Sequence, residues 1–277
     1  MNQEKIPVLN SKDGQCPALG FGTWELTGEN GIDCIKTAIA TGYRHIDTAR
    51  MYENEKEVGQ AIAESGIKRE DIFLTTKIFL GSLDAKSIHQ EFNNSLELLN
   101  TEYVDLLLIH WPSTEEPLTE TLQTMNELHS EGRTKHIGVS NFTISWLKKA
   151  IEISKSPIFC NQVEYHPFLN QDKLLNFCRD QDIPVVAYSP LGNGKVPTSE
   201  ELSEIGEKYN KNAAQVALRW LLQQEQVGAI PRSGNPEHIK SNFEIFDFEL
   251  SDKDMENISQ LRTNEHLINP DFAPAWD

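Results

Sequence analysis

The sequence predicts an α/β fold, a closed (β/α)8 TIM barrel that carries an N-terminal β-hairpin and an extra C-terminal helix. The chain has 277 residues, close to the roughly 250 residues of a typical barrel of this kind. Short, continuous apolar runs alternate with helical segments, which is the pattern of parallel strands covered on both faces. The rival doubly wound fold lacks its fingerprint, because no third glycine follows Gly20 and Gly22 at the required spacing. No linker interrupts the chain, so we expect residues 1–277 to form one barrel domain.

The N-terminal hairpin is expected over residues 5–18, because Asp13-Gly14 is a turn signal, and it would cover the bottom of the barrel. The eight strands of the barrel should be residues 18–21, 43–46, 72–76, 104–109, 137–139, 159–163, 185–188 and 227–230. The helices between them should include residues 54–65, 84–99, 119–131, 144–154, 172–181 and 213–224. Right-handed crossovers through such helices let a parallel sheet close into a barrel. The extra helix should span residues 250–261 with Ser251 as its N-cap, and the proline-broken tail after it should be a loop.

Charge and composition exclude several classes of function. Lys and Arg number 25 and Asp and Glu 42, so the formal net charge is −17. Because phosphate backbones repel so acidic a chain, we expect no nucleic-acid partner. No apolar run reaches the ~18 residues that a membrane span needs, and the N-terminus has no hydrophobic signal region. The four cysteines form no disulfide pattern and the eight histidines show no metal-ligand spacing. We therefore expect a cytoplasmic protein with reduced thiols, no membrane association and no bound metal.

Titratable residues stand where several predicted strands end, which is where barrel enzymes carry their chemistry. Asp47, Lys77 and His110 follow three consecutive strands, and Tyr52 lies five residues after Asp47. A partly buried ammonium needs a carboxylate partner, which Asp47 could supply. The phenol of Tyr52 has an ordinary pKa near ~10 and would become a better proton donor beside the Lys77 ammonium. With a hydrogen bond from His110, these residues would form a general acid and a clamp for a carbonyl oxygen.

Each of these residues also has an ordinary structural interpretation. Tyr52 alone is typical of a half-buried aromatic, and His110 alone of a core histidine. Asp47 with Lys77 is typical of a structural ion pair. None of the four can supply a hydride, so carbonyl chemistry here would need a cofactor. The motifs HExxH, GxSxG and GxxxxGKS/T are absent. They are typical of zinc metalloproteases, serine hydrolases and P-loop proteins, respectively.

Eight segments match the motifs of one family in their order and spacing. They are LGFGTWEL (19–26), GYRHIDTARMYENEKEVGQAI (42–62), TTKI (75–78), DLLLIHWP (105–112), GVSNF (138–142), NQVEYHP (161–167), AYSPLG (187–192) and IPRSGNPEHIKSNF (230–243). On these segments the chain resembles the aldo-keto reductases over nearly its whole length. Its short loops and tail are similar to the microbial branch that includes 2,5-diketogluconate reductases and glyoxal reductases. The resemblance implies a β/α barrel that binds NADP(H) across its C-terminal mouth.

The same resemblance implies the reaction and the role of each catalytic residue. The protein would be an NADPH-dependent oxidoreductase that reduces aldehyde or ketone carbonyls to alcohols by hydride transfer. Tyr52 would donate the proton to the carbonyl oxygen. Lys77 and Asp47 would tune Tyr52, and His110 would orient the substrate.

The implied cofactor is NADPH, with NADH less favoured. At the adenosine end this chain has Arg232 where the family commonly has lysine, and a guanidinium can still hold a 2′-phosphate through two hydrogen bonds. His238 replaces a frequent arginine and Ser241 a frequent glutamate or glutamine. The implied cofactor-binding residues are Gly22, Thr23, Trp24, Asp47, Ser140, Asn141, Gln162, Tyr188, Ser189, Leu191, Arg232, Ser233, His238 and Asn242.

The substrate pocket implied by the resemblance is aromatic and open to small aldehydes or ketones. Its expected residues are Trp24, Met51, Phe79, His110 and Trp111, each of which core packing could also explain. Family members are often monomers, and we expect a monomer here. The alternative function is a non-catalytic, nicotinamide-binding regulatory or structural barrel protein, since the family contains such members.

Overall fold

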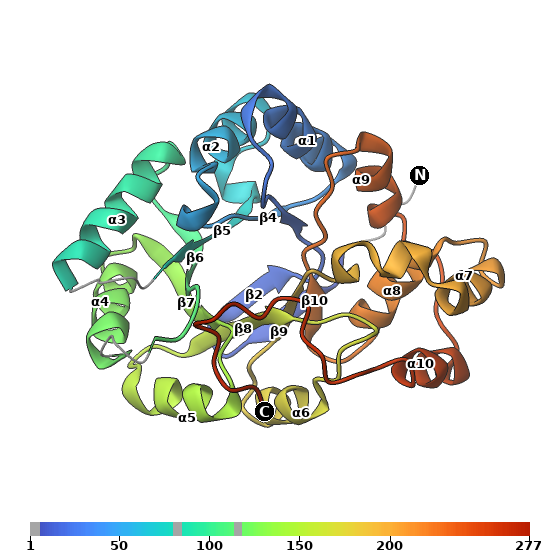
Figure 1. Ribbon diagram of the computed structural model, residues 1–277. Helices are drawn as coiled ribbons and strands as arrows, with labels where there is room; N and C mark the ends of the chain where they lie inside the picture. Colours follow the sequence, from blue (N-terminus) through green and yellow to red (C-terminus); the bar gives the residue numbers. More distant parts are fainter. Residues whose placement is uncertain (1–5, 80–84, 114–117) are drawn as a thin grey trace.

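In the computed structural model, the described residues are 6–79, 85–113 and 118–277. Within them, parallel strands pair in chain order around a ring (Figure 1). The ring closes where Leu19 bridges Ala229, with the Gly20 amide donating to the Ala229 carbonyl at 2.9 Å. The predicted (β/α)8 barrel is confirmed. Its strands are β3 (Phe21–Gly22), β4 (His45–Asp47), β5 (Phe73–Ile78), β6 (Val104–Ile109), β7 (Thr134–Ser140), β8 (Ile158–Glu164), β9 (Val185–Tyr188) and β10 (Val227–Ala229).

Helices surround the ring on its outside, as Figure 1 shows. They are α1 (Gly28–Thr41), α2 (Glu55–Glu64), α3 (Ala85–Leu98), α4 (Leu118–Ser130), α5 (Ile144–Ile153), α6 (Asp172–Asp180), α7 (Glu200–Glu207), α8 (Ala213–Leu222), α9 (Pro236–Phe243) and α10 (Asp252–Ser259). In α3, for example, Ile88, Phe92 and Leu96 recur at helical spacing and are buried, so that stripe faces the strands. The extra helix is α10, whose cap Ser251 accepts a hydrogen bond from the Asp254 amide at 3.2 Å. Among the expected positions, Lys5 and Asp84 lie outside the described residues.

The hydrophobic core has an inner and an outer part. Along β6, Leu106 and Leu108 point into the barrel, while Leu107 and Ile109 pack against the outer helices. This alternation explains why the whole strand is buried and reads as one apolar run.

The N-terminal hairpin closes the bottom of the barrel, as predicted. Its strands β1 (Val8–Ser11) and β2 (Gly14–Pro17) pair antiparallel. Leu9 and Cys16 of the hairpin belong to the inner core cluster. His136 Nδ1, from the first half of β7, lies 2.8 Å from the Asp13 carboxylate in the hairpin turn. The opposite end of the barrel, where the strands finish, is therefore the open end.

The C-terminal tail after α10 contains no helix or strand, as predicted, and runs across β8 and β9 (red in Figure 1). The tail joins the rest of the protein near its start, where the Thr263 amide donates to the Phe168 carbonyl at 2.8 Å. None of the helices among the described residues is long and apolar enough to cross a membrane.

Candidate active site

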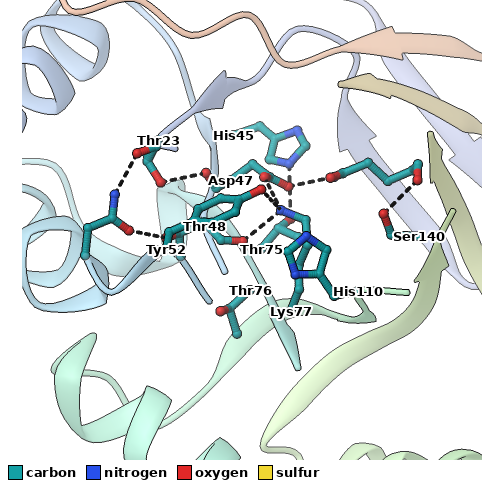
Figure 2. A network of polar contacts seen from close by, with 12 residues as sticks. Thr23, His45, Asp47, Thr48, Tyr52, Thr75, Thr76, Lys77, His110 and Ser140 are labelled. Atoms are coloured by element: carbon teal, nitrogen blue, oxygen red, sulfur yellow. Dashed lines mark hydrogen bonds and ion pairs between the residues drawn. The ribbon is translucent and has the colours of Figure 1, made fainter. Parts of the chain in front are cut away.

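A buried lysine joins the residues at the ends of β4 and β5. Lys77 Nζ donates to Asp47 Oδ1 at 2.5 Å, to the Thr48 carbonyl at 2.9 Å and to Tyr52 Oη at 3.3 Å (Figure 2). The Lys77 side chain is 0% exposed and that of Asp47 is 1% exposed. Three acceptors match the three protons of an ammonium group. The structure thus brings Asp47, Lys77 and Tyr52 together as the sequence predicted.

Tyr52 reaches this lysine because a short 3-10 turn over Arg50–Tyr52 begins three residues after the end of β4. Asn54 fixes the turn: its side-chain amide donates to the carbonyls of Thr23 at 2.6 Å and Leu26 at 3.0 Å. The Thr48 hydroxyl in turn donates to Asn54 Oδ1 at 2.9 Å. Asn54 was not among the predicted site residues, although a polar residue two positions after Tyr52 at a helix start was a usable signal.

Burial and charge act in opposite directions on the two proton carriers. Burial lowers the pKa of Lys77, but Asp47 and Tyr52 more than compensate and its pKa lies above the ordinary value. Burial raises the pKa of Tyr52, and Lys77 offsets only part of that rise. The Lys77 ammonium therefore lowers the pKa of Tyr52, as expected, but burial outweighs this effect and the pKa lies above the ordinary value. Tyr52 is a protonated phenol at neutral pH, and the charge of Lys77 favours its ionised form.

His110 follows β6 and lies edge-on to Tyr52, with 5.7 Å between the ring centroids and 76° between their planes. Burial and then the Lys77 charge lower the pKa of His110 well below its ordinary value, so the imidazole is neutral. Its Nδ1 is buried and has no hydrogen-bond partner in the described part of the chain. A neutral imidazole offers one donor and one acceptor, so His110 can orient a carbonyl without adding charge.

Side-chain amides extend the same network across β7, β8 and β9. Gln162 Nε2 donates to Asp47 Oδ2 at 2.7 Å, and the Ser140 hydroxyl donates to the Gln162 carbonyl at 2.8 Å. Asn141 has φ +63°, a conformation that asparagine tolerates better than most residues. The Tyr188 hydroxyl donates to Asn141 Oδ1 at 2.8 Å.

Asn141 also contacts the catalytic candidates directly, because its Nδ2 donates to the His110 carbonyl at 3.0 Å. Ser140, Asn141 and Gln162, three of the predicted cofactor-binding residues, and the four predicted catalytic residues therefore form one connected group. Thr23 belongs to it as well, since its hydroxyl donates to the Asp47 carbonyl at 3.0 Å.

The residues predicted for the rest of the cofactor lie around the rim. Gly22 ends β3, where an added Cβ would meet the Ile230 carbonyl oxygen at 2.9 Å. Ser189 (φ +46°) and Leu191 stand in the loop after β9. These placements put Gly22, Ser189 and Leu191 at the end of the barrel where the strands finish.

Arg232 occupies the predicted adenosine end, in the loop after β10. Its Nε donates to the Trp24 carbonyl at 2.8 Å, and its Nη2 lies 3.2 Å from the Glu25 carboxylate. Ser233 is largely buried and accepts a hydrogen bond from the Asn235 amide at 3.1 Å. On the neighbouring helix α9, His238 is exposed and Asn242 is buried.

The predicted substrate residues divide into exposed and buried ones. Trp24 and Met51 are about half exposed, while Trp111 is buried. Phe79 packs against His110 with 6.2 Å between ring centroids. Phe272 of the tail contacts both Phe79 and Trp111, at 5.6 and 5.4 Å between centroids. Phe272 was not predicted, because nothing in the local sequence shows which part of the barrel a tail residue reaches.

The donor set fits a nicotinamide nucleotide. The side chains of Ser140, Asn141 and Gln162 provide the donors and acceptors that a carboxamide requires. The partly exposed guanidinium of Arg232 suits a phosphate. Within residues 6–79, 85–113 and 118–277, no group of His, Cys, Asp or Glu could hold a metal ion.

Known proteins are similar to this chain over nearly its whole length. The sequence profile of the Aldo/keto reductase family matches residues 18–263. The chain is 39% identical over 265 residues to methylglyoxal reductase DkgB of Escherichia coli O157:H7, which covers 94% of this chain and 99% of that protein. It is 40% identical over 259 residues to glyoxal reductase of Bacillus subtilis (strain 168), covering 93% of each. The crystal structure of an aldo/keto reductase from Brucella melitensis superposes with a TM-score of 0.89 at 42% identity, covering 93% of this chain and 98% of that one.

Proposed function

Because this chain belongs to the aldo/keto reductase family, we propose that it reduces aldehyde or ketone carbonyls to alcohols with NADPH, using Tyr52 as the proton donor. The observation that carries the proposal is the position of Lys77 Nζ, which lies 2.5 Å from Asp47 and 3.3 Å from the Tyr52 hydroxyl in a buried site. A structural ion pair would not need a phenol as its third partner.

The residues of the chain divide the work of protonation. Tyr52 donates its proton to the carbonyl oxygen, and Lys77 stabilises the resulting phenolate. Asp47 keeps Lys77 charged, and the neutral His110 donates a hydrogen bond that orients the carbonyl. The reduced nicotinamide, when bound, supplies the hydride. Ser140, Asn141 and Gln162 would hold its carboxamide, and Tyr188 would stack on its ring.

NADPH rather than NADH is proposed on the strength of Arg232. Its guanidinium is partly exposed at the rim, and it can bind the 2′-phosphate that distinguishes the two cofactors. The small-aldehyde relatives support a small aldehyde or ketone as substrate. We also propose a single-domain monomer that works in the cytoplasm without nucleic-acid partners.

The first test is the exchange Tyr52→Phe, with NADPH consumption followed at 340 nm on methylglyoxal. We expect the turnover to fall by about 10²- to 10⁴-fold, the usual contribution of a general acid, while the dissociation constant for NADPH stays within about twofold. Tyr103→Phe is the matched control, because Tyr103 precedes β6 at the opposite end of the strand. Turnover at the unmodified rate in the Tyr52 variant would remove Tyr52 from its role.

The alternative, a non-catalytic nicotinamide-binding protein, receives no support from the relatives described above, which are named reductases. Tight NADPH binding without consumption on any member of an aldehyde panel would return it to consideration.

A further inference from the structure

A buried carboxylate outside the catalytic group holds the C-terminal tail. Glu164 is the last residue of β8, and its side chain is 0% exposed. Its Oε2 accepts hydrogen bonds from His266 Nδ1 at 3.0 Å and from the Ile268 amide at 3.2 Å. Its Oε1 accepts from the Leu267 amide at 2.9 Å and from His166 Nε2 at 3.0 Å. Three consecutive tail residues therefore share this one carboxylate.

These contacts determine the charge of Glu164. Burial alone would raise its pKa, but the hydrogen bonds from His166, His266 and the two tail amides lower the pKa to about 2. The group is an anion at neutral pH, and charge-assisted hydrogen bonds to an anion are stronger than those between neutral groups.

From this anchor, aromatic contacts lead along the tail into the predicted pocket. The His266 ring stacks on Trp276, with 4.0 Å between centroids and 12° between planes. Trp276 approaches Trp111 at 6.1 Å. Phe272 contacts Trp111 at 5.4 Å and Phe79 at 5.6 Å. Since Phe79 packs against His110, the tail forms the outer part of one continuous aromatic wall that starts at the catalytic residues.

After the single backbone bridge between Thr263 and Leu169, the tail pairs with no strand, so its position depends on contacts that involve side chains. At its far end the Asp277 carboxylate accepts a hydrogen bond from the Ile144 amide at the start of α5. Phe272 remains 51% exposed although it touches two pocket aromatics. Little burial holds Phe272 in place by itself.

We propose that Glu164 is a positioning residue of the substrate pocket, which fixes the C-terminal tail so that Phe272 completes the wall formed by Phe79 and Trp111. Its role in the pocket rests on the proposed carbonyl reductase function. A small aldehyde bound between Tyr52 and His110 would reach Phe79 at most, whereas the ring of an aromatic aldehyde would extend farther along the wall towards Phe272. Glu164 therefore governs the binding of bulky substrates and leaves the chemical step alone.

The test compares Glu164→Gln with Glu265→Gln, a matched control because Glu265 is an exposed carboxylate on the same tail. The glutamine keeps the volume of Glu164, but it removes the charge and points an NH2 group at one pair of donors. We expect chymotrypsin to cleave after Phe272 at least about tenfold faster in Glu164→Gln, as measured by mass spectrometry. This readout requires no catalytic activity.

Kinetics supply the second readout. In Glu164→Gln we expect the KM for benzaldehyde to rise about five- to tenfold, as the loss of one aromatic contact predicts. The KM for methylglyoxal and the kcat for both aldehydes should stay within about twofold. Phe272→Ala should raise the KM for benzaldehyde similarly, and the double variant should be no worse than either single variant, because both changes remove the same wall.

Several results would overturn the proposal. Unchanged cleavage after Phe272 would show that Glu164 does not hold the tail. Effects of Glu164→Gln and Phe272→Ala that multiply would show that the two residues act separately, and equal losses for both aldehydes would indicate general damage.

His266→Phe keeps the ring that stacks on Trp276 but removes one donor, so it should shift both readouts in the same direction if Glu164→Gln does not fold. An unmodified protein that consumes no NADPH with either aldehyde would refute the proposed function, while the cleavage rates would still decide the anchoring by Glu164.

Discussion

Replacing Lys77 by methionine separates the structural role of the buried ion pair from its catalytic role. The side chains of Lys77 and Asp47 are 0% and 1% exposed, and Lys77 Nζ lies 2.5 Å from Asp47 Oδ1. Without the lysine, Asp47 is left as a buried carboxylate that still accepts a hydrogen bond from Gln162 Nε2 at 2.7 Å. Breaking a buried pair in this way costs about 3–5 kcal/mol. We expect Lys77→Met to lose that much free energy of unfolding.

Adding Asp47→Asn to Lys77→Met removes the stranded charge. Because one buried neutral amide is tolerated far better than one unpaired buried ion, we expect the double variant to regain all but about 1–2 kcal/mol of the loss. Its activity should not return. Lys77 is what lowers the pKa of the buried Tyr52, so without it the phenolate is unstabilised and turnover should stay about 10²- to 10⁴-fold low.

The assay pairs urea unfolding, followed by circular dichroism, with single-turnover NADPH oxidation at 340 nm. Lys135→Met serves as the control, since Lys135 pairs with Asp105 at 2.8 Å but is 48% exposed, and such pairs contribute about 1 kcal/mol or less. Two results would refute the reasoning. Equal instability of the single and double variants would show that the stranded charge is not the cause. Activity that recovers together with stability would show that Lys77 acts only as scaffold.

Three further outcomes follow from the described contacts. Arg232→Ala should weaken NADPH binding by at least about tenfold and NADH binding by less than about twofold, as fluorescence titration would show; equal weakening of both would refute the 2′-phosphate role. The pKa of Glu164 in the folded state is lowered from 4.5 to about 2, so its ionised form stabilises the fold above pH ~4.5 and this stabilisation is lost as the pH falls towards 2. The unfolding free energies of wild type and Glu164→Gln should therefore converge by about 3 kcal/mol over that range. Curves of unfolding free energy against pH that stay parallel would contradict this. Gly228→Ala should cost about 1–3 kcal/mol in urea unfolding, because its Cβ would lie 2.7 Å from the Ala18 carbonyl oxygen, and a stability equal to wild type would show that the hairpin yields at no cost.

Strands buried on both faces were the best-predicted part of the fold. The expected residues 104–109 and 185–188 coincide with β6 and β9. A short, continuous apolar run in a barrel is buried on both faces only as a strand between the interior and the outer helices. The first strand was less well placed, because it pairs regularly only over Phe21–Gly22 while Leu19 forms a single bridge. The helices α1, α7 and α9 were not identified, and α7 shows why: it has eight residues, four of them glutamate.

In the site, residues placed by neighbouring strands could be predicted, whereas residues placed by contacts with distant parts of the sequence could not. The proximity of Asp47, Tyr52, Lys77 and His110 could be predicted because strand order puts the ends of neighbouring parallel strands side by side. Glu164 and Phe272 could not, because their partners lie far away in the sequence: Glu164 binds a segment about a hundred positions later. Conformational preferences of single residues carry no information on which loop a tail will meet.

The hairpin that closes the barrel has a practical consequence for protein engineering. Its contacts, such as that between Asp13 and His136, lie at one end of strands whose other end carries the chemistry. The six residues of β6 span roughly 17–20 Å between these ends, beyond the range at which mutational effects usually couple. Variant libraries directed at the base can therefore be screened for thermal tolerance alone, and their best members can be merged with rim libraries selected for new substrates without a second round of optimisation.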